Sequence, residues 1–124
     1  MIRTTLPLIA GALMSFPATT PVHAAEPELK ARIVVEDAPN ASKQFVGYVT
    51  AQQPFEGRYE LTGEKKGVAG NARVKQAGVV KAAPHQATRL SHLAFGSIAA
   101  DDHYTIQLKI YRGKDLVAQD QIVK

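Results

Sequence analysis

The chain has no cysteine and no tryptophan, and aromatic residues make up only 6% of its 124 residues. Without cysteine, no disulfide can stabilise the fold and no thiolate can bind a metal. Stability must therefore come from the burial of apolar side chains. The bulkiest candidates for the core or its rim are the following aromatic residues: Phe45, Tyr48, Tyr59, Phe95 and Tyr104.

The first 24 residues have the organisation of a Sec-type signal peptide. Arg3 gives a positive start, residues 6–16 form an apolar run too short to cross a bilayer, and residues 22–24 fit a small-x-small cleavage site. Prolines at positions 7, 17 and 21 argue against a buried helix. We therefore expect residues 1–24 to be removed on export to the periplasm. The mature chain, residues 25–124, is expected to be a single domain with no membrane insertion.

The chain has only a mild excess of positive charge, with 15 basic and 11 acidic residues. Of the charged residues, the leader contains only Arg3, so the mature domain has a formal charge of 14 minus 11, or +3. This charge favours acidic partners or surfaces. Export makes nucleic acid an unexpected partner.

The sequence offers no recognisable catalytic or cofactor-binding motif. Three histidines lie beyond the leader: His85, His92 and His103. None is part of an H-x-H or H-E-x-x-H arrangement, so we interpret them as surface or rim residues. Ser91 precedes His92 without a G-x-S-x-G elbow, and the adjacent Asp101 and Asp102 are interpreted as a solvated turn. We expect a protein that is not an enzyme and that uses no metal or cofactor.

Short segments with alternating apolar and polar residues, separated by turn residues, run through the whole mature chain. The expected strands are residues 29–37, 44–51, 57–64, 71–76, 79–82, 87–96, 103–112 and 115–123. Turns every eight to twelve residues predict an all-β, immunoglobulin-like β-sandwich of seven to eight antiparallel strands. Residues 38–40 are typical of a turn. Both faces of segment 44–51 are apolar, so the pattern does not select its inner face.

The segment 103–112 has the clearest alternation. Its inward residues are expected to be Tyr104, Ile106, Leu108 and Ile110. Its outward residues are expected to be Thr105, Gln107, Lys109 and Tyr111. This period of two is typical of a half-buried strand.

A central hairpin is predicted from residues 57–64 and 71–76, with a turn through Gly67 and Gly70. Tyr59 and Leu61 share the inner face. The outer face is basic, and its candidate binding residues are Arg58, Arg73 and Lys75, with Lys65 and Lys66 at the turn and Lys109 added if its strand joins the same sheet. Because cross-strand neighbours lie about 5 Å apart, Arg58, Arg73 and Lys75 are expected to form one local field.

The same stretch resembles the curli assembly chaperone family, the CsgC/CsgH-like proteins. The resemblance rests on Gly57-x-Tyr59-x-Leu61, a Lys-x-Gly at residues 65–67, Gly70, and Gln76-x-Gly78, and it extends over about residues 31–123. Some members carry a Cys-x-Cys pair near the first strand. The matching residues 31–33 contain no cysteine, so no redox activity is implied here.

The resemblance implies a periplasmic chaperone that binds curli-type amyloid fibre subunits transiently and inhibits premature amyloid formation. The curli secretion machinery is a further candidate partner. Contact with the subunit would involve the basic residues Arg58, Arg73, Lys75 and Lys109. Contact would be made either by charge or by strand addition at a sheet edge.

Two other interpretations fit the same sequence features. Alternating charges can serve only to keep a β-protein soluble. The chain can also be an immunoglobulin-like structural or adhesion module that binds an envelope protein or a surface glycan. Genes for a curli-type subunit and its secretion channel beside this one would favour the chaperone.

Overall fold

The structure, a computed structural model, describes residues 28–39, 42–96 and 98–124. The predicted signal peptide lies outside these residues, as does Asn40 of the predicted turn. The described residues form seven strands: β1 (Leu29–Ala38), β2 (Ser42–Ala51), β3 (Phe55–Gly67), β4 (Gly70–Ala82), β5 (Ala87–Ala94), β6 (His103–Arg112) and β7 (Asp115–Val123). They include no helix long and apolar enough to cross a membrane.

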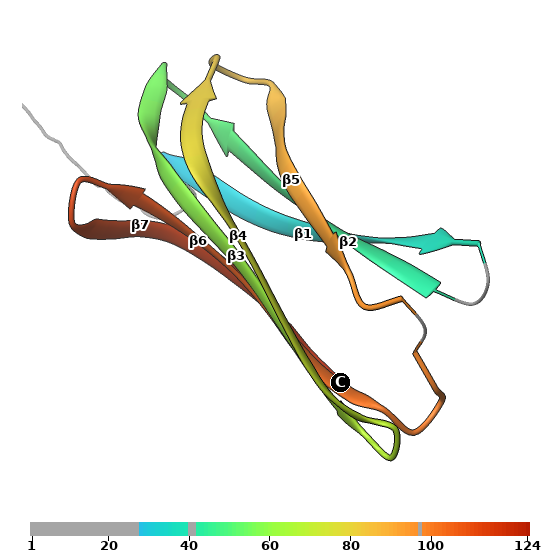
Figure 1. The fold of residues 1–124 in the computed structure, drawn as a ribbon. Helices are drawn as coiled ribbons and strands as arrows, with labels where there is room; N and C mark the ends of the chain where they lie inside the picture. The colour runs from blue at the N-terminus through green and yellow to red at the C-terminus, as the bar shows by residue number, and fades with distance from the viewer. Residues whose placement is uncertain (1–27, 40–41, 97) are drawn as a thin grey trace, which may run out of the picture.

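The strands form two layers (Figure 1). One sheet has the order β1-β2-β5 and the other has the order β4-β3-β6-β7. Every pairing within the two sheets is antiparallel. This arrangement confirms the predicted immunoglobulin-like β-sandwich, with seven strands.

The core lies between the layers and is built from alternate residues of each strand. The alternation predicted for β6 is confirmed: Ile106, Leu108 and Ile110 have no exposed surface and Tyr104 is buried. Phe45 packs its ring against Phe95 and Tyr104, with centroids 6.1 and 5.2 Å apart. The buried aromatic residue that the sequence analysis missed is Phe55, the first residue of β3.

The structure shows which face of β2, the central strand of the three-stranded sheet, points to the core. Phe45, Val49 and Ala51 belong to the core. Val46, on the opposite face, also has no exposed surface. Because the outer face of β2 carries the apolar Val46 and Tyr48 as well as the exposed Thr50, the sequence pattern of this strand did not alternate.

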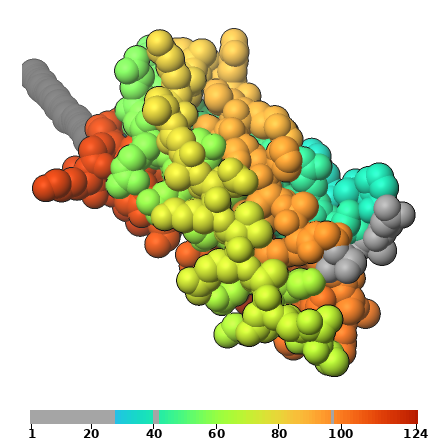
Figure 2. Space-filling view, viewed as in Figure 1, coloured from blue at the N-terminus to red at the C-terminus, as the bar shows by residue number. Residues whose placement is uncertain are grey.

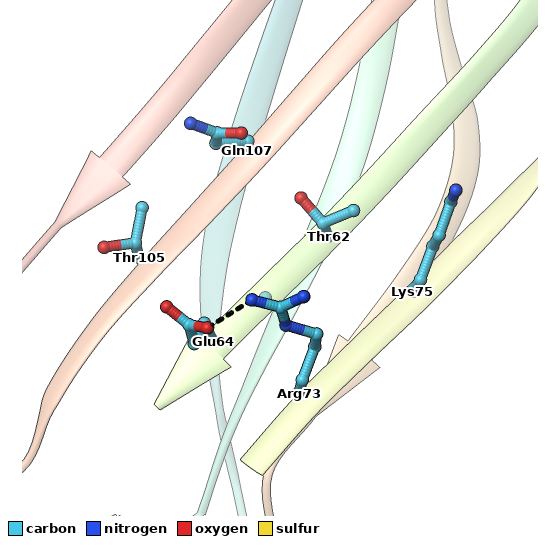
Figure 3. A pocket seen from close by; sticks show the side chains of 7 residues that line it. Thr62, Glu64, Arg73, Lys75, Thr105 and Gln107 are labelled. Atoms are coloured by element: carbon cyan, nitrogen blue, oxygen red, sulfur yellow. Dashed lines mark hydrogen bonds and ion pairs between the residues drawn. The ribbon is translucent and has the colours of Figure 1, made fainter. Parts of the chain in front are cut away.

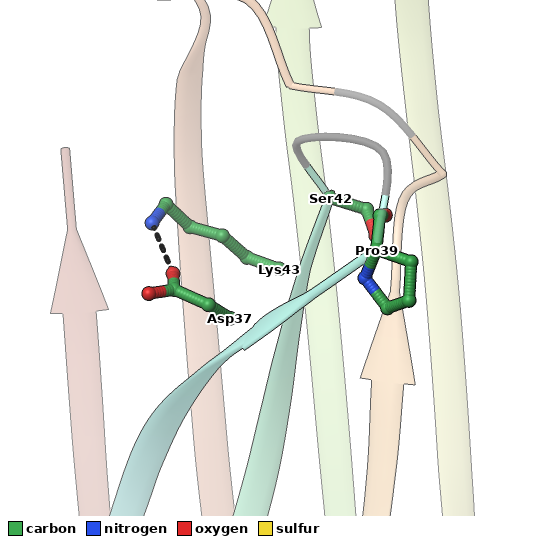
Figure 4. Close-up of polar contacts among 4 residues, drawn as sticks. All are labelled: Asp37, Pro39, Ser42 and Lys43. Atoms are coloured by element: carbon green, nitrogen blue, oxygen red, sulfur yellow. Dashed lines mark hydrogen bonds and ion pairs between the residues drawn. The ribbon is translucent and has the colours of Figure 1, made fainter.

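Local polar contacts join the end of β1 to the start of β2 (Figure 4). The Ser42 hydroxyl donates a hydrogen bond to the Pro39 carbonyl at 2.8 Å. Lys43 forms an ion pair with Asp37, directly opposite in the ladder, at 3.1 Å. These contacts are exposed, so they define the register here more than they stabilise the fold.

The predicted separate strand at residues 79–82 is wrong, because β4 continues without a break from Gly70 to Ala82. The residue that suggested the break, Gly78, lies opposite Tyr59 in the ladder. A Cβ atom at Gly78 would lie 3.0 Å from Cε1 of the Tyr59 ring. The glycine therefore admits an aromatic ring beside the strand and does not end it.

Two expectations about the hairpin end are also wrong. Lys65 lies on the inner face, and Asp102 is buried with only 6% of its surface exposed. Lys65 Nζ lies 3.6 Å from Asp102 Oδ2, and Asp102 accepts a hydrogen bond from the Ala99 amide at 2.8 Å. A Cβ at Gly67 would collide with the Asp102 carboxylate. Asp102 is thus a buried link between the β5–β6 connection and the hairpin.

One side of the sandwich is closed between the two sheets. Strands β1 and β7 lie against each other there. The Ile33 amide, in the edge strand β1, donates a hydrogen bond to Asp120 Oδ2 at 2.8 Å. A side chain of β7 thereby satisfies a backbone donor of β1 that faces no partner strand among the described residues.

Candidate functional site

The four predicted binding residues come together on the outer face of one sheet. Arg58 lies on β3, Arg73 and Lys75 lie on β4, and Lys109 lies on β6. Strand β3 runs between the other two strands. Lys109 was expected to extend the candidate site only if its strand joined the sheet of the hairpin, and it does. We call the outward surface of these four residues the basic face.

Glu60 is the centre of one charged cluster on the basic face. Its Oε2 atom lies 3.2 Å from Arg58 Nη1 and 3.9 Å from Lys75 Nζ. Lys109 lies directly opposite Glu60 in the β3–β6 ladder. The Arg58 guanidinium also stacks 4.2 Å above the ring centroid of Tyr111. This stacking fixes the orientation of Arg58.

Arg73 and Glu64 form a second cluster at a hollow in the same surface (Figure 3). Arg73 Nη2 donates to Glu64 Oε2 at 2.6 Å. The hollow has a volume of about 420 Å³. Six of its seven lining residues have polar or charged side chains: Thr62, Glu64, Arg73, Lys75, Thr105 and Gln107, with Gly63 the seventh. Hydroxyl, amide and charged groups at an open sheet surface are suited to bind polar chain segments.

The three cations Arg58, Arg73 and Lys75 are held by two different carboxylates, Glu60 and Glu64. Opposite Arg58 on β4 is Val79, whereas Lys75 lies opposite Thr62 and Arg73 opposite Glu64. Arg58 and Lys75 still approach within a Debye length, about 8 Å, because both contact the same Glu60 oxygen. Arg73 is positioned separately by Glu64.

The predicted basic face left two carboxylates out of its charge. Glu60 and Glu64 alternate with the cations on the outer face, so the four cations and two carboxylates leave a formal charge of +2. The signal was present in the sequence, since Glu60 and Glu64 have the same parity as Arg58 on β3. The basic face is therefore a surface of paired charges with a positive excess.

Arg73 lowers the pKa of Glu64, first through its hydrogen bond and then through its charge. We predict that Glu64 titrates below the ordinary range of a glutamate and that Arg73→Gln raises its pKa. Because the folded-state pKa is the lower one, this stabilisation is present above the unfolded-state pKa and is lost as the pH falls through the folded-state pKa. Carbon NMR of the Glu64 carboxyl during a pH titration measures its pKa in the wild-type protein and in Arg73→Gln. An unchanged pKa in Arg73→Gln would contradict the pairing.

The remaining polar candidates of the sequence do not converge on one another. His85, His92 and His103 are all exposed, as expected for surface residues. Within residues 28–39, 42–96 and 98–124, no group of three histidine, aspartate or glutamate side chains could hold a metal ion. The basic face therefore remains the candidate site.

Comparisons with known proteins agree with the fold and identify the family. The chain is similar in structure to CsgH of R. palustris, with a TM-score of 0.61 and 22% identity over 77% of this chain and 91% of that one. It is also similar to the E. coli curli protein CsgC, with a TM-score of 0.64 and 19% identity over 75% of this chain and 96% of that one. No curated protein matched by sequence. A family model described as CsgH protein matches residues 35–121, more than half of the chain. The chain therefore belongs to the CsgH protein family.

Proposed function

We propose that this protein takes part in curli biogenesis as a periplasmic chaperone that binds fibre subunits transiently and inhibits premature amyloid formation. The observation that carries the proposal is membership of the CsgH family. The structural similarity to the curli protein CsgC supports it. The proposal includes export through cleavage of residues 1–24 and no catalytic role.

The basic face supports this function physically. Arg73 and Lys75 expose 78% and 59% of their side chains, so both charges can reach a partner while held by Glu64 and Glu60. The excess of positive charge on this sheet attracts acidic segments of a partner chain over a distance. This attraction raises the rate at which the two molecules meet and does not require a tight complex. Such contact can keep a disordered subunit from meeting other subunits. The secretion machinery remains a further proposed partner.

The experiment is a charge reversal with a matched control. We expect Arg58→Glu, Arg73→Glu and Lys75→Glu together to abolish the delay that the wild-type protein imposes on fibre formation by a purified curli subunit. Added salt should shorten the wild-type delay, since exposed charges are screened. Fibre formation is followed by the fluorescence of an amyloid dye, and circular dichroism establishes that the variant is folded.

The control reverses three exposed cations that lie elsewhere: Lys30 and Arg32 on β1, and Lys114 in the β6–β7 turn. It changes the net charge by the same amount. We expect this control variant to delay fibres as the wild type does. Equal loss of the delay in both variants would show that net charge alone matters, and a full delay in the first variant would refute a role for the basic face.

A further inference from the structure

Strand β4 has an edge whose backbone groups pair with no other strand of the described residues. A two-residue turn makes Gly67 and Gly70 the closing, hydrogen-bonded pair of the hairpin. Hydrogen-bonded and non-hydrogen-bonded pairs alternate in an antiparallel ladder. The amides and carbonyls of residues 71, 73, 75 and 77 therefore point away from β3. Across the described part of the chain, β4 pairs with no strand except β3.

This edge differs from the edges on the other side of the sandwich. There β1 and β7 lie against each other, and Asp120 accepts the Ile33 amide. On the β4 side, β5 has 8 residues whereas β4 has 13. Figure 2 shows β4, in yellow and yellow-green, along the near surface down to the tip of the hairpin. The hairpin half of β4 is thus open to solvent.

The side chains at this edge select the kind of strand that can pair with it. The residues with outward backbone groups also direct their side chains to the basic face, and two of them are Arg73 and Lys75. Antiparallel pairing with β4 of a second copy would place the cations of the two copies close together. Repulsion between these like charges makes such pairing unfavourable. A strand with carboxylates on the same face would be attracted.

We propose that residues 71–77 of β4 accept an extended polypeptide segment that carries carboxylate side chains at alternate positions. Residues two apart in any strand are separated by about 7 Å. Carboxylates at every second position therefore match the spacing of Arg73 and Lys75. The backbone of the segment would bind the free amides and carbonyls of the edge, which is strand addition. This inference rests on the proposed function, because it states how a subunit segment is held.

Hydrogen exchange measured by NMR tests the contact directly. The probe is a nine-residue peptide that alternates glutamate and threonine, compared with a peptide of the same composition whose glutamates are consecutive. We expect the alternating peptide to slow the exchange of the Arg73, Lys75 and Ala77 amides at least tenfold. The amides of residues 72, 74 and 76 should change little, because they already bond to β3. Equal protection by both peptides, or none, would overturn the proposal.

A proline variant separates strand addition from contact with the sheet face. Ala77 is exposed, carries no charge, and has an amide directed away from β3. Ala77→Pro removes that donor and blocks pairing at an edge position that tolerates proline. We expect it to bind the alternating peptide at least tenfold more weakly, whereas Ala77→Val binds as the wild type does. Unchanged binding by Ala77→Pro would place the contact on the sheet face and overturn strand addition.

The same variants distinguish this inference from the proposed function. If Ala77→Pro delays fibre formation fully and binds the peptide normally, strand addition fails while the chaperone function stands. If the wild-type protein does not delay fibre formation, the proposed chaperone function is wrong. The hydrogen-exchange pattern with the peptides then decides by itself whether β4 accepts an added strand. Sedimentation of the wild-type protein completes the test, since a β4-mediated dimer would show that a second copy is the true occupant.

Discussion

Replacement of Leu108 by alanine is expected to lower the free energy of unfolding by about 2–5 kcal/mol, the range for emptying a core leucine site. Leu108 has no exposed surface and lies in the middle of β6, between β3 and β7. A domain of this size is stable by only about 5–15 kcal/mol, so the loss is a large fraction of the total. Chemical denaturation followed by circular dichroism measures it.

Lys109→Ala is the matched control, because its side chain is on the outer face and only half-buried. We expect it to cost far less than Leu108→Ala. A reversed order of the two costs would mean that the register of β6 is shifted by one residue.

Gly47 offers a second check on the same packing. A Cβ atom at Gly47 would lie 3.3 Å from Leu108 Cδ1. Gly47→Ala should therefore lower the free energy of unfolding more in the wild-type background than in the Leu108→Ala background. In the second background the Leu108 atoms that the new Cβ would crowd are absent. Equal costs in both backgrounds would show that the two residues do not interact.

Replacement of Asp102 by alanine is expected to cost about 3 kcal/mol, at the lower end of the range for removing one member of a buried ion pair. Asp102 is 6% exposed and the Lys65 side chain is 13% exposed. The change also removes the acceptor of the Ala99 amide. The cost stays near the lower end because a lysine at a strand end can move its ammonium group toward water. Denaturant unfolding provides the measurement.

Two variants separate the parts of this effect. Asp101→Ala changes the exposed neighbour and is expected to shift stability by less than about 0.5 kcal/mol. Asp102→Asn keeps an acceptor for the Ala99 amide but removes the charge, so its cost should lie between the other two. If Asp101→Ala and Asp102→Ala cost the same, the buried link has no role in stability.

The sequence predicted strands well where one face is buried and the other is solvated. In β6 the alternation placed every inward residue correctly, because a period of two directly reflects burial on one side. The strand at 44–51 was predicted, but the pattern did not select its inner face, and the predicted break near Gly78 is wrong. The outer face of β2 carries the apolar residues Val46 and Tyr48, so its two faces are not told apart by hydropathy. A glycine inside a strand cannot be told by residue type from a glycine that ends one.

The candidate site shows the same division. The parity of Arg58, Arg73 and Lys75 on their strands was enough to place them on one outward face. Their ion pairs were not predicted, because Glu60 and Glu64 reach specific partners only once the ladder register is known.

The sequence by itself determined the all-β class, the hairpin, the inward residues of β6 and the basic character of one outer face, since each follows from local alternation and turn chemistry. Only the tertiary structure decided the order of strands in the two sheets, the inward position of Lys65 and the burial of Asp102. It also decided that β7 covers the edge of β1 while the hairpin half of β4 stays open. These features depend on which distant segments become neighbours, and local patterns carry no information about that choice.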